Sequence, residues 1–248
     1  MKAMVLAAGL GTRLRPLTND RPKALVEVAG RPLLEITLRR LREYDIRDVI
    51  INVHHFPDMI VDYLQRFGNF GMHIEISREE VLLDTGGGLK KASWFFLEPP
   101  GENEPFLLHN VDVLSSINFE RMLEFHRGQN ALATLAVQQR ETSRLLLFDE
   151  DDQLCGRKTG PTHEVEVVHP APSMQELAFS GIHVISPRLL SMLTERDAFS
   201  IIPAYLRLAA QGEKICAFHA DDYYWRDLGK AENIASAERD LEALLFRI

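Results

Sequence analysis

Short apolar runs alternate with longer amphipathic segments along the first half of the chain. The runs are rich in Val, Ile and Leu and have the length of buried strands, whereas the apolar residues between them recur at helical spacing. The pattern predicts strands at residues 3–8, 26–28, 49–53, 73–76 and 106–108. It predicts helices over 31–44, from Pro57 to about Gly68, and over 85–97, with a break at Pro99-Pro100-Gly101. Such alternation is typical of an α/β protein whose parallel sheet is covered by helices on both faces.

The second half of the chain is less regular. We expect strands at residues 131–137, 144–148, 177–185, 214–218 and 223–227, and helices over 187–193, 201–210 and 231–245. The stretch 156–176 contains prolines and has no clear period, so it is predicted to be a loop over the site or an excursion from the fold. The sequence shows no internal repeat and no hexapeptide run of the kind that builds a left-handed β-helix.

The first apolar run ends in a glycine-rich, cationic loop. Gly9 and Gly11 allow the backbone to turn and to approach a ligand, and consecutive N–H groups in such a loop form a concavity for an anion. Arg13 and Lys23 follow, and their side chains suit a polyphosphate. A dinucleotide-binding fingerprint would need glycine where Leu14 stands, and the Gly-Lys-Ser/Thr end of a P-loop is absent. The loop is therefore a phosphate-binding loop of another kind.

The segment GLGTRLRPLT from Gly9 to Thr18, followed by Pro22-Lys23, resembles the signature of the sugar-phosphate nucleotidyltransferases, also called NDP-sugar pyrophosphorylases. The resemblance implies a Rossmann-like, mixed but mainly parallel sheet flanked by helices. It also implies a loop that wraps the triphosphate of an NTP. One nucleotidyltransferase domain would span the chain, divided into a mainly nucleotide-binding part (1–112), a mainly sugar-phosphate-binding part (113–230) and a C-terminal helix (231–248).

A second glycine-rich segment, Leu83 to Leu89, resembles the segment that in the family lines the nucleobase and sugar side of the cleft. Triple glycine is costly inside a helix, so we expect a close approach of backbone to ligand here, with Thr85 as a cap of the following helix. Together the two segments predict these nucleotide-binding residues: Ala7, Ala8, Gly9, Gly11, Thr12, Arg13, Lys23, Asp84, Thr85, Gly86 and Gly87.

Two aspartates are candidate metal ligands. Asp112 follows a buried strand, and Asp227 lies in the segment Tyr-Trp-Arg-Asp-Leu-Gly. Either one alone would be read as a cap or turn residue. In the family, an aspartate after the fourth strand and another in a W-x-D-x-G segment hold Mg²⁺ against the α-phosphate, and both positions match. The resemblance therefore implies a Mg²⁺ cofactor on Asp112 and Asp227, and Arg13, Lys23 and Asp112 as catalytic residues.

The sugar-phosphate side carries weaker signals. Ser180 and Gly181 resemble the segment that places a glycine N–H against the sugar, and Asn110 precedes the metal candidate. We take these three residues as sugar-phosphate-binding. The Glu-Lys-Pro segment that relatives use for the sugar phosphate is absent, and Arg157-Lys158 is a poor substitute for it. Histidines at 54, 55 and 109 are interpreted as structural, because no spaced third metal ligand accompanies them.

The implied reaction joins an NTP and a sugar 1-phosphate into an NDP-sugar, with release of pyrophosphate. The compact length and the two motifs FSGI and DTGGG look most like short uridylyltransferases that act on N-acetylmuramate 1-phosphate in cell-wall recycling. UTP is thus the first choice of nucleotide and GTP, with mannose 1-phosphate, the second; thymidylyltransferases share nearly all the motifs. Two other classes stay open: a catalytically silent regulatory subunit, and a cytidylyltransferase for choline phosphate or a similar non-sugar.

Composition narrows the partners further. A formal charge of -8 and a pI near 5.6 argue against a nucleic-acid surface, so the cationic loop is a local feature suited to a small anion. Two cysteines are too few for a disulfide framework or a zinc cluster. With no apolar stretch near the ~20 residues of a membrane span, we expect a reduced, cytoplasmic protein without membrane partners. Homo-oligomerisation is left open by the sequence.

Overall fold

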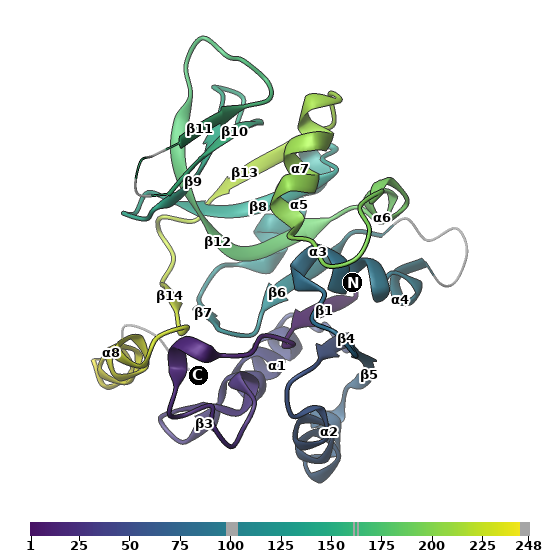
Figure 1. Cartoon of the computed structure of the whole chain (residues 1–248), viewed down its shortest axis with the longest axis vertical. Helices are drawn as coiled ribbons and strands as arrows, with labels where there is room; N and C mark the ends of the chain where they lie inside the picture. Colours follow the sequence, from purple (N-terminus) through teal and green to yellow (C-terminus); the bar gives the residue numbers. More distant parts are fainter. Residues whose placement is uncertain (98–103, 161, 163, 244–248) are drawn as a thin grey trace.

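A ten-stranded mixed sheet forms the framework of the protein, in the order β11-β10-β9-β12-β6-β1-β4-β5, with β8 beside β12 and β13 beside β8 (Figure 1). This computed structural model describes residues 1–97, 104–160, 162 and 164–243. The expected break at 99–101 and the end of the C-terminal helix lie outside them. The strands are β1 (Ala3–Leu6), β4 (Asp48–Val53), β5 (His73–Arg78), β6 (Phe106–Asn110), β8 (Ala133–Gln138), β9 (Arg144–Phe148), β10 (Leu154–Thr159), β11 (Glu164–Val167), β12 (Gln175–Ile185) and β13 (Ile215–His219).

Strand direction divides this sheet. Strand β1 pairs in parallel with β4 and β6, and β4 pairs in parallel with β5. Beyond β6, strand β12 runs antiparallel to β6, β8 and β9, and the hairpins continue to β11 at the edge. The chain passes from β1 to β4 on one side of β1, and it later returns to form β6 on the other side of β1. Ligands of open α/β sheets bind beyond the carboxyl ends of strands at such a switch point. The crevice beyond β1 and β6 is therefore the expected site.

Helices cover both faces of the sheet, because strand residues alternate between them. Ala3 and Val5 belong to a core that includes residues of α1, α2, α5 and α8, whereas Met4 belongs to a core with residues of α3, α4, α6 and α7. The helices are α1 (Leu33–Glu43), α2 (Pro57–Arg66), α3 (Asp84–Lys91), α4 (Trp94–Leu97), α5 (Phe119–Gln129), α6 (Arg188–Met192), α7 (Ile201–Ala210) and α8 (Ala231–Glu242). Short 3₁₀ turns lie at η1 (Thr12–Leu14), η2 (Lys23–Leu25) and η3 (Gly68–Gly71).

Two small sheets complete the fold. Strands β2 (Glu27–Val28) and β3 (Arg31–Pro32) form a hairpin before α1. Strands β7 (Val113–Ser115) and β14 (Trp225–Asp227) pair antiparallel. The second pairing matters for the site, because it joins the segment after β6 to the segment before α8. Figure 1 shows β14 descending from the upper half of the molecule to α8.

The structure confirms an α/β protein with a mixed sheet flanked by helices, and it corrects two local predictions. The single helix expected over 85–97 is broken into α3 and α4. The stretch 156–176, expected as a loop, contains most of β10, all of β11 and the start of β12. Strand β11 is an edge strand whose residues are all exposed, so it lacks the apolar run that marks a buried strand. Its alternation of Glu and Val was the available signal.

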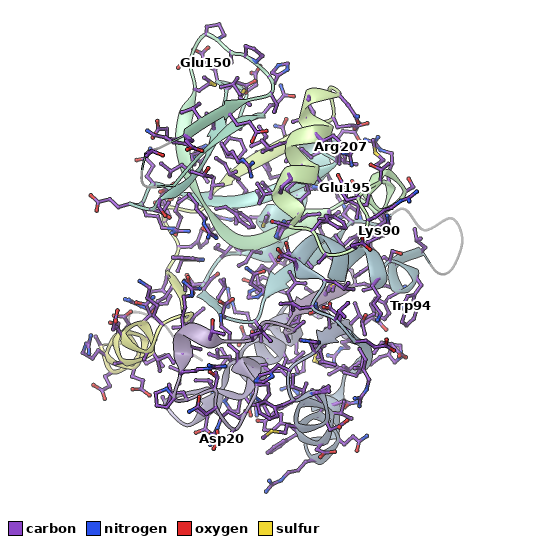
Figure 2. The ribbon with its side chains drawn as sticks, viewed as in Figure 1. Asp20, Lys90, Trp94, Glu150, Glu195 and Arg207 are labelled. Atoms are coloured by element: carbon purple, nitrogen blue, oxygen red, sulfur yellow. The ribbon has the colours of Figure 1, made fainter. Side chains whose placement is uncertain are left out.

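Side-chain contacts fix α3 against α7. The Lys90 ammonium donates to the Glu195 carbonyl oxygen at 2.7 Å, and the Arg207 guanidinium pairs with the Glu195 carboxylate at 2.8 Å. Figure 2 labels these three side chains on the α7 side of the molecule. The two cysteines, Cys155 and Cys216, are buried free thiols. Among the described residues, no helix has the length and apolarity needed to cross a membrane.

Candidate active site

The loop after β1 is held in shape by its own residues and by β4. The Ala7 N–H donates to the side-chain oxygen of Asn52 at 2.8 Å. Gly11 has a φ of 63°, and a Cβ there would lie 2.9 Å from the Thr18 methyl group and 3.1 Å from the Lys23 Cβ. The Thr18 hydroxyl donates to the Gly11 carbonyl at 2.8 Å. Only glycine meets both the backbone and the space requirement at this turn.

A cavity of about 520 Å³ lies beyond the carboxyl ends of β1 and β6. It gathers residues that the sequence predicted as separate segments: Ala8, Gly9, Lys23, Asp84, Thr85, Asn110 and Asp112. Asn52, an amide within the apolar run of β4, also lines it and donates to the Glu79 carboxylate at 2.8 Å. We call this space the nucleotide cavity. Asn52 was missed from the sequence, although a buried amide inside the run 49–53 was a signal.

The glycine triplet at the start of α3 packs tightly against the segment before α7. The N–H groups of Gly86 and Gly87 donate to the Phe199 carbonyl at 2.9 and 3.2 Å. A Cβ at Gly86 would lie 2.3 Å from the Phe199 ring, and one at Gly87 would lie 2.9 Å from the Asp197 carbonyl. Packing is thus one reason for these glycines, and the close approach of ligand stays a prediction. The Thr85 hydroxyl accepts from the Ile201 N–H at 3.0 Å, so it caps α7 rather than its own helix.

Replacing Gly86 by alanine is expected to destabilise the fold. The added methyl group would overlap the Phe199 ring, and overpacking of this kind costs about 1–3 kcal/mol, which corresponds to several degrees in Tm. Differential scanning fluorimetry of Gly86→Ala measures this. Gly128→Ala in α5 is the matched control, since no heavy atom lies within 4 Å of a Cβ placed at Gly128. Equal Tm values for both variants would contradict the packing role.

A second cavity, of about 460 Å³, adjoins the first. Asn110 and Asp112 line both, and the second also contains Arg13, Ser180, Gly181 and Asp227. We call it the sugar cavity, after the sugar-phosphate-binding residues predicted in it. Gly181, with a φ of 75°, stands in an irregular part of β12, where a Cβ would lie 2.9 Å from the Asn110 amide nitrogen. Ala7, Gly11, Thr12, Gly86 and Gly87, all predicted to bind nucleotide, line neither cavity.

The strand pairing of β7 and β14 brings the two predicted metal ligands together. Asp227 is opposite Val113, and the Leu228 N–H donates to the Asp112 carbonyl oxygen at 2.8 Å. The Asp112 carboxylate accepts a hydrogen bond from the Lys23 ammonium. The Asp227 carboxylate accepts from the Gly229 N–H at 2.6 Å.

A comparison with protein families decides what kind of protein carries this site. The model of the nucleotidyl transferase family matches residues 2–243. The chain belongs to the nucleotidyl transferase family. Among curated relatives, an N-acetylmuramate alpha-1-phosphate uridylyltransferase of Caulobacter vibrioides is 36% identical, with 96% of each chain covered. A mannose-1-phosphate guanyltransferase of Yarrowia lipolytica is 28% identical over 95% of this chain and 62% of its own length.

Solved structures of nucleotidyltransferases share the fold. A putative glucose-1-phosphate thymidylyltransferase from Bacillus anthracis has a TM-score of 0.79 at 18% identity, with 100% of this chain and 98% of that chain covered. A UDP-glucose pyrophosphorylase complexed with UDP-glucose has a TM-score of 0.74 at 19% identity, with 98% of each chain covered. These matches confirm the Rossmann-like fold of the NDP-sugar pyrophosphorylases for this nucleotidyl transferase.

The carboxylates of this nucleotidyl transferase fit a hard divalent cation. Mg²⁺ prefers oxygen ligands and is commonly bound through one or two carboxylates together with substrate phosphates. Asp112 and Asp227 supply two carboxylates to one cavity. No group of three or more His, Cys, Asp or Glu side chains is placed to hold an ion within the part of the chain that the structure describes. A coordination shell here would therefore include oxygens from the substrates.

Gly229 gives Arg13 room beside Asp227. A Cβ at this position would lie 2.7 Å from Nη2 of Arg13 and 2.8 Å from the Asp227 carboxylate. The glycine of the W-x-D-x-G segment is thus the residue over which the guanidinium lies. Sequence reasoning had not included it among the site residues.

Gly229→Ala is expected to reduce kcat while leaving the fold intact. The clashing atoms are the far ends of two flexible side chains, so they would move aside, and misplacement by about 1 Å can cost on the order of 10²-fold in rate. Steady-state kinetics together with Tm measures both effects, and Gly128→Ala is again the control. Unchanged kcat in a folded Gly229→Ala variant would show that the position of Arg13 is unimportant.

Arg140, which the sequence did not single out, forms a wall of the sugar cavity. Its guanidinium lies 3.8 Å from the centre of the Trp225 ring and donates to the Phe179 carbonyl at 2.5 Å. The Trp225 indole N–H donates to the Ser180 carbonyl at 2.7 Å. Burial lowers the pKa of Arg140, and the Asp227 carboxylate partly opposes that shift. These contacts connect the strand that carries Asp227 to the β12 segment that carries Ser180 and Gly181.

Two of the three histidines interpreted as structural, His54 and His109, form hydrogen bonds with backbone carbonyl groups. The ring of His109 is buried, and its Nδ1–H donates to the Asn110 carbonyl oxygen at 2.8 Å, because a carbonyl can only accept. Burial lowers the pKa of His109 to about 4, so the ring is neutral near neutral pH. His54 bonds the Glu79 carbonyl at 2.9 Å. Neither histidine lines the nucleotide cavity or the sugar cavity.

Proposed function

We propose that this chain transfers the nucleotidyl group of an NTP to a sugar 1-phosphate, giving an NDP-sugar and pyrophosphate. The observation that carries the proposal is the junction of two cavities at Asn110 and Asp112. Lys23 lines one cavity and Arg13 the other, so cations stand on both sides of the junction. An enzyme that joins two phosphate-bearing substrates needs two adjoining spaces with neutralising charge where they meet.

In the proposed reaction, a phosphate oxygen of the sugar 1-phosphate attacks the α-phosphorus of the NTP. The new bond joins that oxygen to the α-phosphorus, and the bond between the α-phosphorus and the β-bridging oxygen breaks. Pyrophosphate leaves with the electron pair. The attacking oxygen is already anionic at neutral pH, so no general base is required. The chain must instead align two anions and neutralise the charge that develops between them.

Each predicted residue has a part in that task. Gly9, Gly11 and Thr12 hold the triphosphate through their backbone N–H groups. Lys23 neutralises charge at the α-phosphate, and Arg13 stabilises the departing pyrophosphate. Asp112 and Asp227 would hold Mg²⁺, which supplies Lewis-acid polarisation of phosphoryl oxygens when bound.

The substrates we favour are UTP and N-acetylmuramate 1-phosphate, in a cytoplasmic reaction. The support is the relative from Caulobacter vibrioides, which bears that activity in its name and is matched over 96% of both chains. GTP with mannose 1-phosphate is the second candidate. It is supported by the guanyltransferase of Yarrowia lipolytica, but this chain matches only 62% of that protein's length.

A silent regulatory subunit is less well supported. Such a subunit would be expected to have lost Arg13, Lys23 or a carboxylate, and all are present. A cytidylyltransferase for choline phosphate would need an aromatic cage around the acceptor. The aromatic residues of the sugar cavity are Phe179 and Trp225, and Trp225 is already covered by Arg140.

Pyrophosphate release across a grid of substrates tests the proposal. UTP, GTP, dTTP, CTP and ATP are each combined, in the presence of Mg²⁺, with N-acetylmuramate, N-acetylglucosamine, mannose or glucose 1-phosphate, or with phosphocholine. We expect release to require both substrates and to be greatest with UTP and N-acetylmuramate 1-phosphate. If no pair of substrates released pyrophosphate although the folded protein bound nucleotide, the protein would have to be interpreted as a regulatory module and not as an enzyme.

A further inference from the structure

One face of the β9–β10 hairpin presents two arginines, a threonine and a leucine to the sugar cavity. In the antiparallel register, Arg144 is opposite Thr159 and Arg157 is opposite Leu146. Residues two apart in a strand share a face, and directly paired residues share it too. All four side chains therefore lie on one face, and all four line the sugar cavity.

The two arginines of this face differ in their partners. Arg157 is opposite Glu166 on β11, and its guanidinium pairs with that carboxylate at 2.7 Å. The exposed side chain of Arg144 forms no ion pair with any described residue. Lys158 lies between these positions on the opposite face of β10 and pairs with Glu176 at 2.8 Å. Arg144 is thus the uncompensated charge of the hairpin face, with Arg157 diagonally beside it.

This hairpin lies away from the end of the cavity where the phosphates would react. Asp112, Asp227 and Arg13 gather around the pairing of β7 and β14, whereas β9 and β10 lie in the upper half of the molecule in Figure 1. The sugar cavity extends between these two regions. A sugar 1-phosphate with its phosphate at Asp112 would direct the far substituents of its ring toward Arg144.

We propose that Arg144, assisted by Arg157, binds a carboxylate substituent on the sugar ring, and that the site selects acidic sugar 1-phosphates over neutral ones. The proposal rests on the proposed function and deepens it. Cations for the phosphates are already present at Lys23 and Arg13, so a neutral sugar would leave Arg144 without a use. A guanidinium presents a planar fork that matches a carboxylate, and the Thr159 hydroxyl directly across the ladder adds a donor.

The test compares N-acetylmuramate 1-phosphate with N-acetylglucosamine 1-phosphate, which lacks the lactyl carboxylate, in the wild type, in Arg144→Gln and in Lys158→Gln. The readout is the ratio of kcat/KM for the two acceptors, with Tm and the KM for UTP as checks. We expect the wild type to favour the acid, and Arg144→Gln to lower that ratio by on the order of 10- to 100-fold, mainly through KM for the acid. Lys158→Gln, on the opposite face, keeps the wild-type ratio.

Each other outcome overturns the inference in a distinguishable way. An equal loss for both acceptors in Arg144→Gln would show that Arg144 holds the phosphate they share. A wild type without preference for the acid would remove the carboxylate site and leave nucleotidyl transfer standing. No pyrophosphate release with either acceptor would remove both the carboxylate site and UTP-dependent transfer to these two sugars, whereas only silence across the wider substrate grid would remove the proposed function itself.

Discussion

Arg13→Ala is expected to lower kcat by about 10²–10³-fold while changing the dissociation constant for UTP less than about tenfold. Arg13 lines the sugar cavity beside Asp227 and Gly229, and it does not line the nucleotide cavity. We therefore propose that its charge acts on the reacting phosphates more than on binding of the nucleotide. A donor that acts on charge developed in the transition state contributes to kcat more than to ground-state binding. Single-turnover kinetics and calorimetric titration with UTP measure the two quantities separately.

Arg15→Ala is the matched control for Arg13→Ala. Both side chains are exposed arginines of the same loop, but Arg15 lines neither cavity. We expect the Arg15 variant to keep wild-type kcat. Loss of UTP binding in parallel with kcat in Arg13→Ala would assign Arg13 to nucleotide binding and would remove it from the chemical step.

Asp227→Asn is expected to have the larger effect, a loss of about 10³-fold in kcat or more, since metal polarisation is worth several kcal/mol. The fold should persist, because the amide oxygen of asparagine can still accept the hydrogen bond that the Gly229 N–H donates at 2.6 Å. Binding of Mn²⁺ to the enzyme in the presence of UTP, followed by electron paramagnetic resonance, supplies a readout that does not depend on turnover. We expect weaker Mn²⁺ binding in this variant.

Asp222→Asn controls for the loss of one negative charge in the same segment. Asp222 is exposed and lines neither cavity, so its amide variant should bind Mn²⁺ and turn over as the wild type does. If Asp227→Asn bound Mn²⁺ as tightly as Asp222→Asn, Asp227 would not be a metal ligand.

The parallel half of the fold was predictable because each of its strands and helices is marked by a pattern of neighbouring residues in the sequence. Strands β1, β4, β5 and β6 are short apolar runs separated by amphipathic helices, and each was placed within a few residues. The exposed edge strand β11 was missed, because exposure removes the apolar run on which the prediction depends. A Glu-Val alternation in four residues is too short to stand out beside neighbouring prolines.

The site was predictable only as far as its motifs carry information. Gly9, Lys23 and Asp84 come from separate segments that were all expected to bind the nucleotide, and the structure places them in one cavity. The packing of the glycine triplet was missed, because its partner Phe199 is distant in the sequence and this contact is visible only in the folded chain. The face formed by Arg144 and Arg157 depends on the register between β9 and β10, which includes an irregularity near Leu154. No spacing rule reveals such a register.

The central claim is attack on the α-phosphorus of the NTP, and the fate of isotopic label tests it most directly. The enzyme is incubated with the favoured sugar 1-phosphate and Mg²⁺, once with α-³²P-UTP and once with γ-³²P-UTP. The account predicts α-label in the NDP-sugar and γ-label in pyrophosphate. Transfer of γ-label to the sugar, or its release as orthophosphate, would contradict nucleotidyl transfer and the arrangement of residues derived from it.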